Sequence, residues 1–113
     1  MGRHTFDITT DNFQAQVLDS ELPVLVDFGA DWCPPCKMLD PIVDGLAQKY
    51  EGTMRIGKID VDVHPDLQMQ FGVMGLPTLI LFREGAPVQR IVGFQIEKQI
   101  EAQLLPHLNV EQA

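Results

Sequence analysis

Apolar residues follow two patterns along this chain: short continuous runs, and longer stretches in which they recur every three or four positions. A short apolar run bounded by turn residues is typical of a buried strand. The most continuous run is Val24-Leu25-Val26-Asp27-Phe28. Together the runs predict strands at residues 5–8, 24–28, 54–61, 78–82 and 87–92. The segment Arg83-Glu84-Gly85-Ala86 predicts a hairpin turn between the last two.

The stretches with helical spacing fall between these runs. The longest follows Cys36, and its apolar positions are Leu39, Ile42, Val43, Leu46, Ala47 and Tyr50. An earlier helix, with Thr9 or Thr10 as its N-cap, would bury Phe13, Val17 and Leu18. A short helix would begin at Pro65 and end near Gly72. The apolar face of the final helix would consist of Ile96, Ile100, Leu104 and Leu108.

Strands and helices therefore alternate, with a hairpin before the last helix. Right-handed helical crossovers make the first strands parallel, whereas a hairpin is antiparallel. The expected fold class is α/β, a central mixed sheet of about five strands flanked by about four helices on both faces. A chain of 113 residues is expected to be one domain, residues 1–113, with room for one core but not for two.

Charge and composition exclude several classes of partner. The net charge of −8 argues against nucleic acid and against an anionic membrane surface. No apolar stretch approaches the roughly 18 residues of a membrane span. The segment from Met1 to Asp7 lacks the apolar core of a secretory signal. Two cysteines are too few for a disulfide framework. We therefore expect a cytoplasmic protein, and by default a monomer.

The strongest chemical signal is Trp32-Cys33-Pro34-Pro35-Cys36, which contains both cysteines. In a Cys-x-x-Cys pair, one thiolate can attack a disulfide while the other waits within reach to displace it. The pair follows a buried strand and opens a helix, where free amides and the helix dipole stabilise a thiolate. The alternative is a zinc half-site, which needs two further ligands. No second ligand pair lies near the scattered residues His4, His64 and His107, so no metal site is expected.

Asp27 is the one charged residue in the most apolar strand. Burying a carboxylate is costly, and burial raises its pKa. With strict alternation of buried and exposed positions, Asp27 would instead face solvent at a sheet edge. The continuous apolar run favours the buried position, so Asp27 is a candidate functional residue.

Further motifs occur in a fixed order over essentially the whole chain. They are Val26-Asp27-Phe28, Ala30-Asp31-Trp32-Cys33, Cys36-Lys37-Met38, Pro41, Lys58-Ile59-Asp60-Val61-Asp62 and Gly75-Leu76-Pro77-Thr78, with Gly85, Val92 and Gly93. With this set the chain resembles the thioredoxin family. The resemblance implies the thioredoxin fold and the activity of a protein-disulfide reductase, a thiol–disulfide oxidoreductase.

The resemblance also implies a role for each catalytic candidate. Cys33 would be the exposed nucleophile and Cys36 the buried resolving thiol, and the two would form a redox-active disulfide. Asp27 would relay a proton for Cys36 through water. Lys58, on the neighbouring strand, would pair with Asp27; the alternative for Lys58 is a solvated lysine at a strand end.

A substrate-binding surface is implied in the same way. Pro77 matches the family's cis-proline, which leaves the preceding backbone free to pair with an extended substrate. The apolar residues expected around Cys33 are Trp32, Pro34, Pro35, Leu76, Pro77, Gly93 and Phe94. Such a patch can dock flexible partners, and ordinary packing is the alternative.

The expected partners are protein disulfide substrates and a thioredoxin reductase. The chain would bind no cofactor, because a flavin-dependent reductase would supply electrons from NADPH. Two other classes remain open at this point. The same fold can serve as a disulfide oxidant or isomerase, or as a binding subunit whose dithiol is incidental.

Four positions depart from the common pattern of the family. Pro34 replaces a glycine and removes an amide near Cys33, while two successive prolines stiffen the first helical turn. Asp40 replaces a small residue, and we expect it to be a solvated residue on the flank of the helix. Phe94 would make the docking groove narrower or more apolar, and Gly29 would loosen packing beside Trp32.

Overall fold

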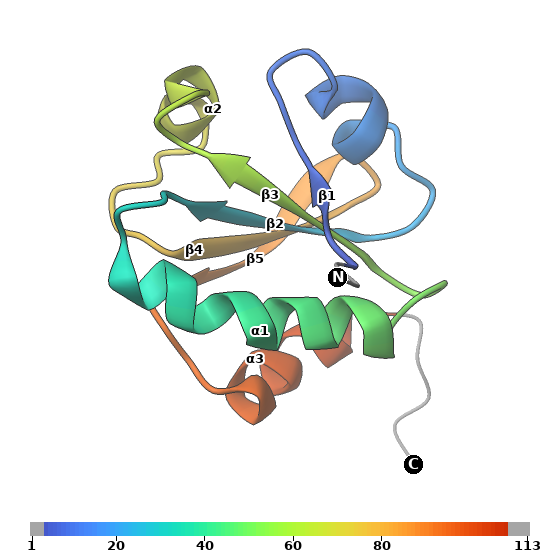
Figure 1. Cartoon of the computed structure of the whole chain (residues 1–113). Helices are drawn as coiled ribbons and strands as arrows, with labels where there is room; N and C mark the ends of the chain where they lie inside the picture. Colours follow the sequence, from blue (N-terminus) through green and yellow to red (C-terminus); the bar gives the residue numbers. More distant parts are fainter. Residues whose placement is uncertain (1–3, 109–113) are drawn as a thin grey trace.

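A five-stranded sheet forms the centre of the computed structural model, which describes residues 4–108 (Figure 1). The strands lie in the order β1-β3-β2-β4-β5. Their bounds are Phe6–Asp7 for β1, Val24–Gly29 for β2, Arg55–Asp60 for β3, Thr78–Arg83 for β4 and Ala86–Val92 for β5. The central position of β2 follows from its sequence, because a strand buried on both faces tolerates a nearly continuous apolar run.

The strand directions confirm the predicted mixed sheet. Strands β1, β3 and β2 are mutually parallel, whereas β4 runs antiparallel to both β2 and β5. The β4–β5 hairpin turns at Glu84 and Gly85, which both have positive φ. Asp27 lies opposite Lys58 in the β2–β3 register. The two side chains therefore leave the sheet on the same face, one strand apart.

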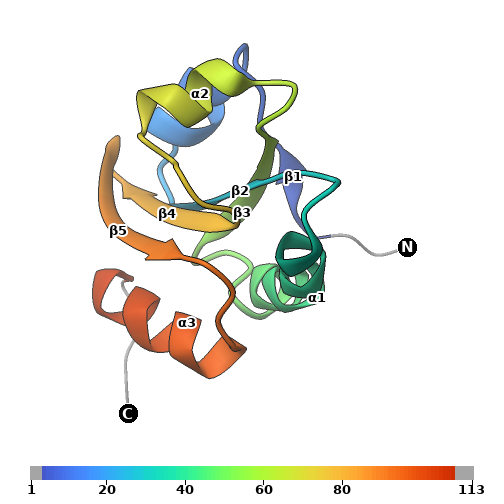
Figure 2. The ribbon, with the colours of Figure 1, turned by 90° about the vertical axis from the view of Figure 1, so that its left-hand side faces the viewer.

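Helices cover both faces of the sheet (Figures 1 and 2). The helices α1, Pro34–Lys49, and α3, Glu97–Leu104, lie on one face. The helix α2, Pro65–Gln70, and the short π-helix η1, Gln14–Leu18, lie on the other, and a 3₁₀ turn, η2, Leu105–His107, follows α3. Within residues 4–108, no helix combines the length and the apolar character of a membrane span.

Alternation along β2 creates a separate core on each face. Val24, Val26 and Phe28 pack with the residues beneath α2 and η1, whereas Leu25 packs with those of α1 and α3. Asp27 is two positions after Leu25, so its side chain lies on the same face of the sheet and points toward α1. The face that α1 covers thus receives one carboxyl group from the middle of the central strand.

The N-terminal helix differs from its prediction. It is a five-residue π-helix beginning at Gln14, and no side chain caps it. Thr9 and Asn12 instead bond each other reciprocally, with Thr9 N to Asn12 Oδ1 at 2.8 Å and Asn12 N to Thr9 Oγ1 at 3.1 Å. These bonds hold the residues before the helix in a turn, and Thr9 and Thr10 are therefore not its N-cap.

The final helix is also shorter than the apolar spacing predicts. Ile100 and Leu104 are buried in α3, and Leu108 is buried after the η2 turn. Ile96 is the N-cap residue, and it is exposed. Its extended backbone directs the side chain away from the face that the helix buries, so the prediction for Ile96 was wrong.

Two glycines provide a matched test of this packing. A Cβ atom on Gly57, in β3, would lie 2.5 Å from Ile8 Cδ1 and 2.9 Å from Phe6 Cζ. Gly57→Ala should therefore lower the free energy of unfolding by about 1–3 kcal/mol, as overpacking does. Gly45, in α1, has open space around it, and Gly45→Ala should raise that energy by up to about 1 kcal/mol. Urea unfolding of both oxidised variants checks this, and equal effects would contradict the β1–β3 packing.

Candidate active site

A disulfide joins Cys33 and Cys36 where β2 gives way to α1. Cys33 is the N-cap residue of α1, and its Cα lies 5.3 Å from that of Cys36. Pro34 and Pro35 occupy the first helical positions, where a missing amide costs little. The Cys36 amide is the first available donor, and it reaches Cys33 Sγ at 3.3 Å. The predicted position of the pair at a helix N-terminus is confirmed.

Both cysteines are buried, which corrects the expectation of an exposed Cys33. The exposed fraction is 3% for Cys33 and 6% for Cys36. The backbone holds Cys33 in place from both sides, because its amide donates to Ala30 O at 3.2 Å and its carbonyl accepts from Lys37 N at 3.2 Å. The difference between the two sulfurs is therefore in the surroundings that each one faces.

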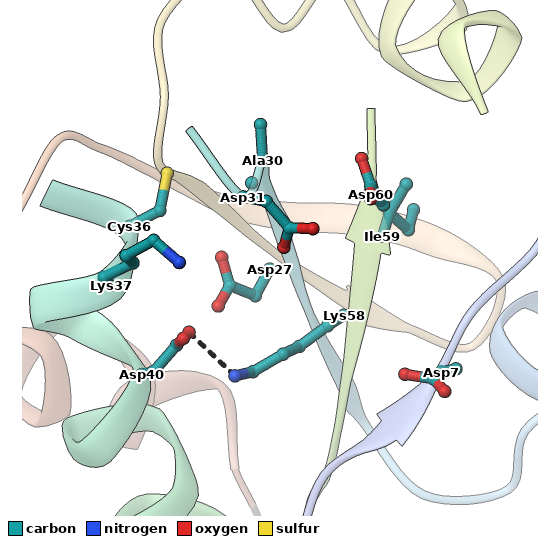
Figure 3. Close-up of a pocket in the computed structure, with 11 residues that line it drawn as sticks. Asp7, Asp27, Ala30, Asp31, Cys36, Lys37, Asp40, Lys58, Ile59 and Asp60 are labelled. Atoms are coloured by element: carbon teal, nitrogen blue, oxygen red, sulfur yellow. Dashed lines mark hydrogen bonds and ion pairs between the residues drawn. The ribbon is translucent and has the colours of Figure 1, made fainter. Parts of the chain in front are cut away.

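The two cysteines line different pockets. Cys33 lines a pocket with Trp32, Pro34, Pro35, Val61, Asp62, Gln68, Met74 and Leu76. Cys36 lines a second pocket, drawn in Figure 3, with Asp7, Asp27, Gly29, Ala30, Asp31, Lys37, Asp40, Lys58, Ile59 and Asp60. We call these the Cys33 pocket and the Cys36 pocket. The first is rich in apolar side chains and the second in carboxylates.

The Cys33 pocket includes only part of the predicted docking surface. Pro77, Gly93 and Phe94 do not line it. Pro77 is buried, and its carbonyl accepts from Gly93 N at 2.8 Å, which ties the residue before β4 to the residue after β5. Phe94 is exposed beyond the end of β5. The predicted cis bond between Leu76 and Pro77 is confirmed.

Met74 is a residue of this pocket that the sequence interpretation missed. It is 94% exposed, and it stands directly before the Gly75-Leu76-Pro77 segment. A single apolar residue in a loop has no periodic signal, and only its position next to the proline motif could have indicated it. Trp32 is exposed as well, and its Nε1 donates to Asp62 Oδ2 at 2.8 Å.

Asp27 lies in the Cys36 pocket, buried as predicted. Its exposed fraction is 4%, which rules out the solvent-facing alternative. Among residues 4–108, no group hydrogen-bonds its Oδ1 atom. Burial raises the pKa of Asp27 from 3.8 to about 7; Lys58 lowers it, and the negative charge of Asp40 raises it further. A carboxyl group beside the disulfide therefore exchanges its proton near neutral pH.

Lys58 does not pair with Asp27, contrary to the prediction. Its Nζ atom lies 2.7 Å from Asp40 Oδ1 (Figure 3). An ammonium group gains more from a half-exposed carboxylate that stays charged than from a buried one that holds its proton. Asp40, expected to be a solvated flank residue, is thus an ion-pair partner within the site. Sequence spacing placed it on the margin of the buried face of α1, but not opposite Lys58.

Gly29 also lies in the Cys36 pocket. A Cβ atom there would lie 3.4 Å from Cys36 Sγ and 3.9 Å from Asp27 Oδ1. The missing side chain therefore leaves space beside the disulfide and the buried acid, rather than beside Trp32 as expected. The pocket connects Cys36 with Asp27.

The histidines take part in other contacts. His4 bonds Asp44, through its amide at 2.5 Å and through Nδ1 at 3.3 Å, and His64 Nδ1 lies 3.1 Å from Thr10 Oγ1. Among the residues that the structure describes, no group of three or more His, Cys, Asp or Glu side chains is arranged to hold a metal ion. The chemistry of the site is that of a reversible disulfide beside a proton-exchanging acid.

Comparison with known proteins agrees with this geometry. The family model described as Thioredoxin matches residues 4–105. The thioredoxin of Alicyclobacillus acidocaldarius subsp. acidocaldarius is 44% identical over 100 residues, covering 88% of this chain and 94% of that protein. Thioredoxin 1 of Nostoc sp. is 42% identical over 101 residues, covering 89% and 94%. A bifunctional thioredoxin reductase/thioredoxin of Mycobacterium leprae is 46% identical over 89 residues, covering 79% and 19%.

The burial of Asp27 makes a prediction about stability and pH. Below about pH 4, the carboxyl group is protonated in both the folded and the unfolded chain. As the pH rises toward 7, only the unfolded chain loses the proton, because the pKa of Asp27 is about 7 in the fold. Folding stability therefore falls across this interval and is constant above it.

Asp27→Asn should remove this loss. The variant should match the wild type near pH 4 and exceed its free energy of unfolding at pH 8 by on the order of 4 kcal/mol, at about 1.4 kcal/mol per pH unit. Denaturant unfolding of the oxidised proteins at both pH values measures the difference. A gap of the same size at both would argue against a buried carboxyl group with a raised pKa.

Proposed function

The chain belongs to the thioredoxin family, and on that premise we propose that Cys33 attacks substrate disulfides while Cys36, with Asp27 and Lys58, completes the exchange. The activity is that of a protein-disulfide reductase. The observation that carries the assignment is the division of the disulfide between two pockets. Cys33 lies in the apolar pocket, which also contains the exposed Trp32 and Met74, and Cys36 lies in the pocket that holds Asp27.

The first step joins the substrate to Cys33 in a mixed disulfide. The Cys33 thiolate attacks a substrate disulfide, a Cys33–substrate disulfide forms, and the other substrate sulfur leaves and takes up a proton. The Cys36 amide, which lies 3.3 Å from Cys33 Sγ in the oxidised protein, donates to the attacking thiolate. Charge-assisted bonds of this kind are stronger than neutral ones.

The second step releases the substrate. Asp27 accepts the proton of the Cys36 thiol, and the Cys36 thiolate attacks Cys33 Sγ. The Cys33–Cys36 disulfide forms again, and the released substrate thiolate takes up a proton. The dithiol has then given two electrons to the substrate. A pKa of about 7 for Asp27 supports this role, since a base with a pKa near the working pH is the most effective.

The Cys33 pocket is our proposed docking surface for protein disulfide substrates. Trp32, Pro34, Pro35 and Leu76 line it with Met74, and we keep Pro77 and Gly93, which bond each other, as adjoining contacts. Leu76 precedes β4, and within the described part of the chain its backbone takes no part in the sheet pairing. An extended substrate segment could therefore pair with it. We keep Phe94 as a peripheral contact, beyond the end of β5.

We propose that a thioredoxin reductase returns the disulfide to the dithiol. The Mycobacterium leprae relative supports this, because its name joins a thioredoxin reductase and a thioredoxin in one protein. The electrons would come from NADPH through the flavin of that enzyme, so this chain needs no bound cofactor of its own.

In the cytoplasm, thiols are kept reduced and protein disulfides are rare and transient, which suits a protein-disulfide reductase. We therefore propose that the protein acts in the cytoplasm. We further propose that residues 1–113 act as one monomeric domain, without nucleic acid or membrane as a partner. The net charge of −8 supports the last point.

The order of attack predicts which cysteine variant accumulates an adduct. Cys36→Ser should trap the mixed disulfide on Cys33, because no thiol remains to resolve it. The matched Cys33→Ser variant should form little or no adduct with the same substrate. Non-reducing gels and intact-mass spectrometry with a disulfide-bonded substrate protein measure both. Adduct on Cys33→Ser alone would reverse the two assignments.

The reduction potential separates a reductase from a redox-tuned oxidant or isomerase. We expect the Cys33–Cys36 pair to equilibrate near the roughly −270 mV of thioredoxin, rather than near the roughly −180 mV of protein disulfide isomerase. Titration against a dithiol buffer, read by thiol alkylation, gives the value. A potential at or above the second figure would remove the support for a cytoplasmic reductase.

A further inference from the structure

We propose that Asp40 is a positioning residue for the exchange reaction: its carboxylate holds the Lys58 ammonium group away from Asp27. The buried acid is thereby left without a direct cationic partner and can hold and release its proton near neutral pH. The inference rests on the proposed role of Asp27 and adds a residue that this role does not itself require.

The register of the sheet would otherwise favour a direct pair. Asp27 and Lys58 are partners across β2 and β3, so their side chains share a face and start one strand apart. Yet Lys58 Nζ lies 2.7 Å from Asp40 Oδ1, whereas Asp27 Oδ1 has no hydrogen-bond partner among residues 4–108. Lys58 therefore pairs with Asp40 rather than with Asp27, its neighbour across the two strands.

Helix α1 provides the alternative partner. Asp40 stands four positions after Cys36, and roughly one helical turn separates the two residues. In the view of Figure 3, the Asp27 carboxyl group lies between the Cys36 sulfur and the Asp40–Lys58 pair. The Asp40 side chain is half exposed, so its charge costs little to keep. The helix that carries the resolving cysteine thus also sets the position of Lys58.

Other charged groups also lie around Asp27 and contribute to the electrostatic field at its carboxyl group. Lys37 and Asp31 line the pocket near the disulfide, Asp60 lies on β3 and Asp7 lies on β1. Asp44, one turn after Asp40 on α1, is held by His4. Lys58 Nζ bonds Asp40, and Asp7 lies opposite Lys58 in the β1–β3 register.

Asp40 and Asp27 are therefore alternative partners for the Lys58 ammonium group. Paired with Asp40, Lys58 leaves Asp27 with the full cost of desolvation. Paired with Asp27, it would stabilise the carboxylate and weaken it as a base for the Cys36 thiol. Removing Asp40 should therefore lower the pKa of Asp27 in two ways. It frees Lys58 to approach the carboxyl group, and it removes a nearby negative charge.

A double-mutant cycle separates these two effects. The readout is the ¹³C shift of the Asp27 carboxyl carbon against pH in the oxidised protein, where no thiol titrates; Asp27→Asn assigns the signal. We expect Asp40→Ala to lower the midpoint by about 1 pH unit, because an opposite charge within 4–6 Å lowers a carboxyl pKa by about 1–3. In a Lys58→Met background, the same change should shift the midpoint by less than half as much.

Two further variants complete the design. Asp40→Glu keeps a carboxylate for Lys58 and should hold the midpoint near its wild-type value, and Asp44→Ala, on the same helix, should leave it in place. Equal shifts from Asp40→Ala with and without Lys58 would overturn the proposal, because Asp40 would then act by direct repulsion alone. An unchanged midpoint in Asp40→Ala would overturn it as well.

The rate of resolution tests the function separately. The release of reduced substrate from the mixed disulfide, followed against pH, should move to lower pH in Asp40→Ala together with the Asp27 midpoint. A midpoint that moves while the rate profile stays fixed would confirm the Asp40–Lys58 arrangement and reject Asp27 as the proton acceptor. Failure of the two ideas is therefore distinguishable.

Discussion

The whole site depends on one costly placement, a carboxyl group buried in the central strand. Asp27 sits between apolar residues of β2 and points toward α1 instead of into solvent. Desolvation keeps it protonated to about neutral pH, at a cost in stability that the surrounding core must offset. The sheet order puts this strand in the middle, so the carboxyl group lies away from the sheet edges and meets solvent through the Cys36 pocket.

The register of β2 and β3 and the path of α1 determine what surrounds that acid. Parallel pairing brings Lys58 alongside Asp27, and the helix brings Cys36 and Asp40 over the same face. Because these groups come from three elements, no single local change can rearrange all of them. The competition of two carboxyl groups for one ammonium group is a property of this tertiary arrangement.

Local patterns predicted much of this. Apolar runs and helical spacing were sufficient for the order of elements along the chain and for the burial of Asp27, because both depend on patterns within one element. The predicted exposure of Cys33 was wrong, because its side chain packs into the core cluster beneath α2 and η1, a contact between elements. The Lys58–Asp40 pair and the place of Met74 were missed because they depend on contacts between elements. The family pattern predicted Asp27 as the partner of Lys58. In this chain Asp40, where the family commonly has a small residue, is the partner instead.

The disulfide also acts as a partition. Cys33 faces one pocket and Cys36 the other, so a protein that covers the apolar side leaves the acidic side uncovered. In the proposed exchange, electrons would pass between Cys33 and the docked protein on one side, while protons would be exchanged through the Cys36 pocket on the other. Docking can then be tight and dry without isolating Asp27 from the solvent that must return its proton.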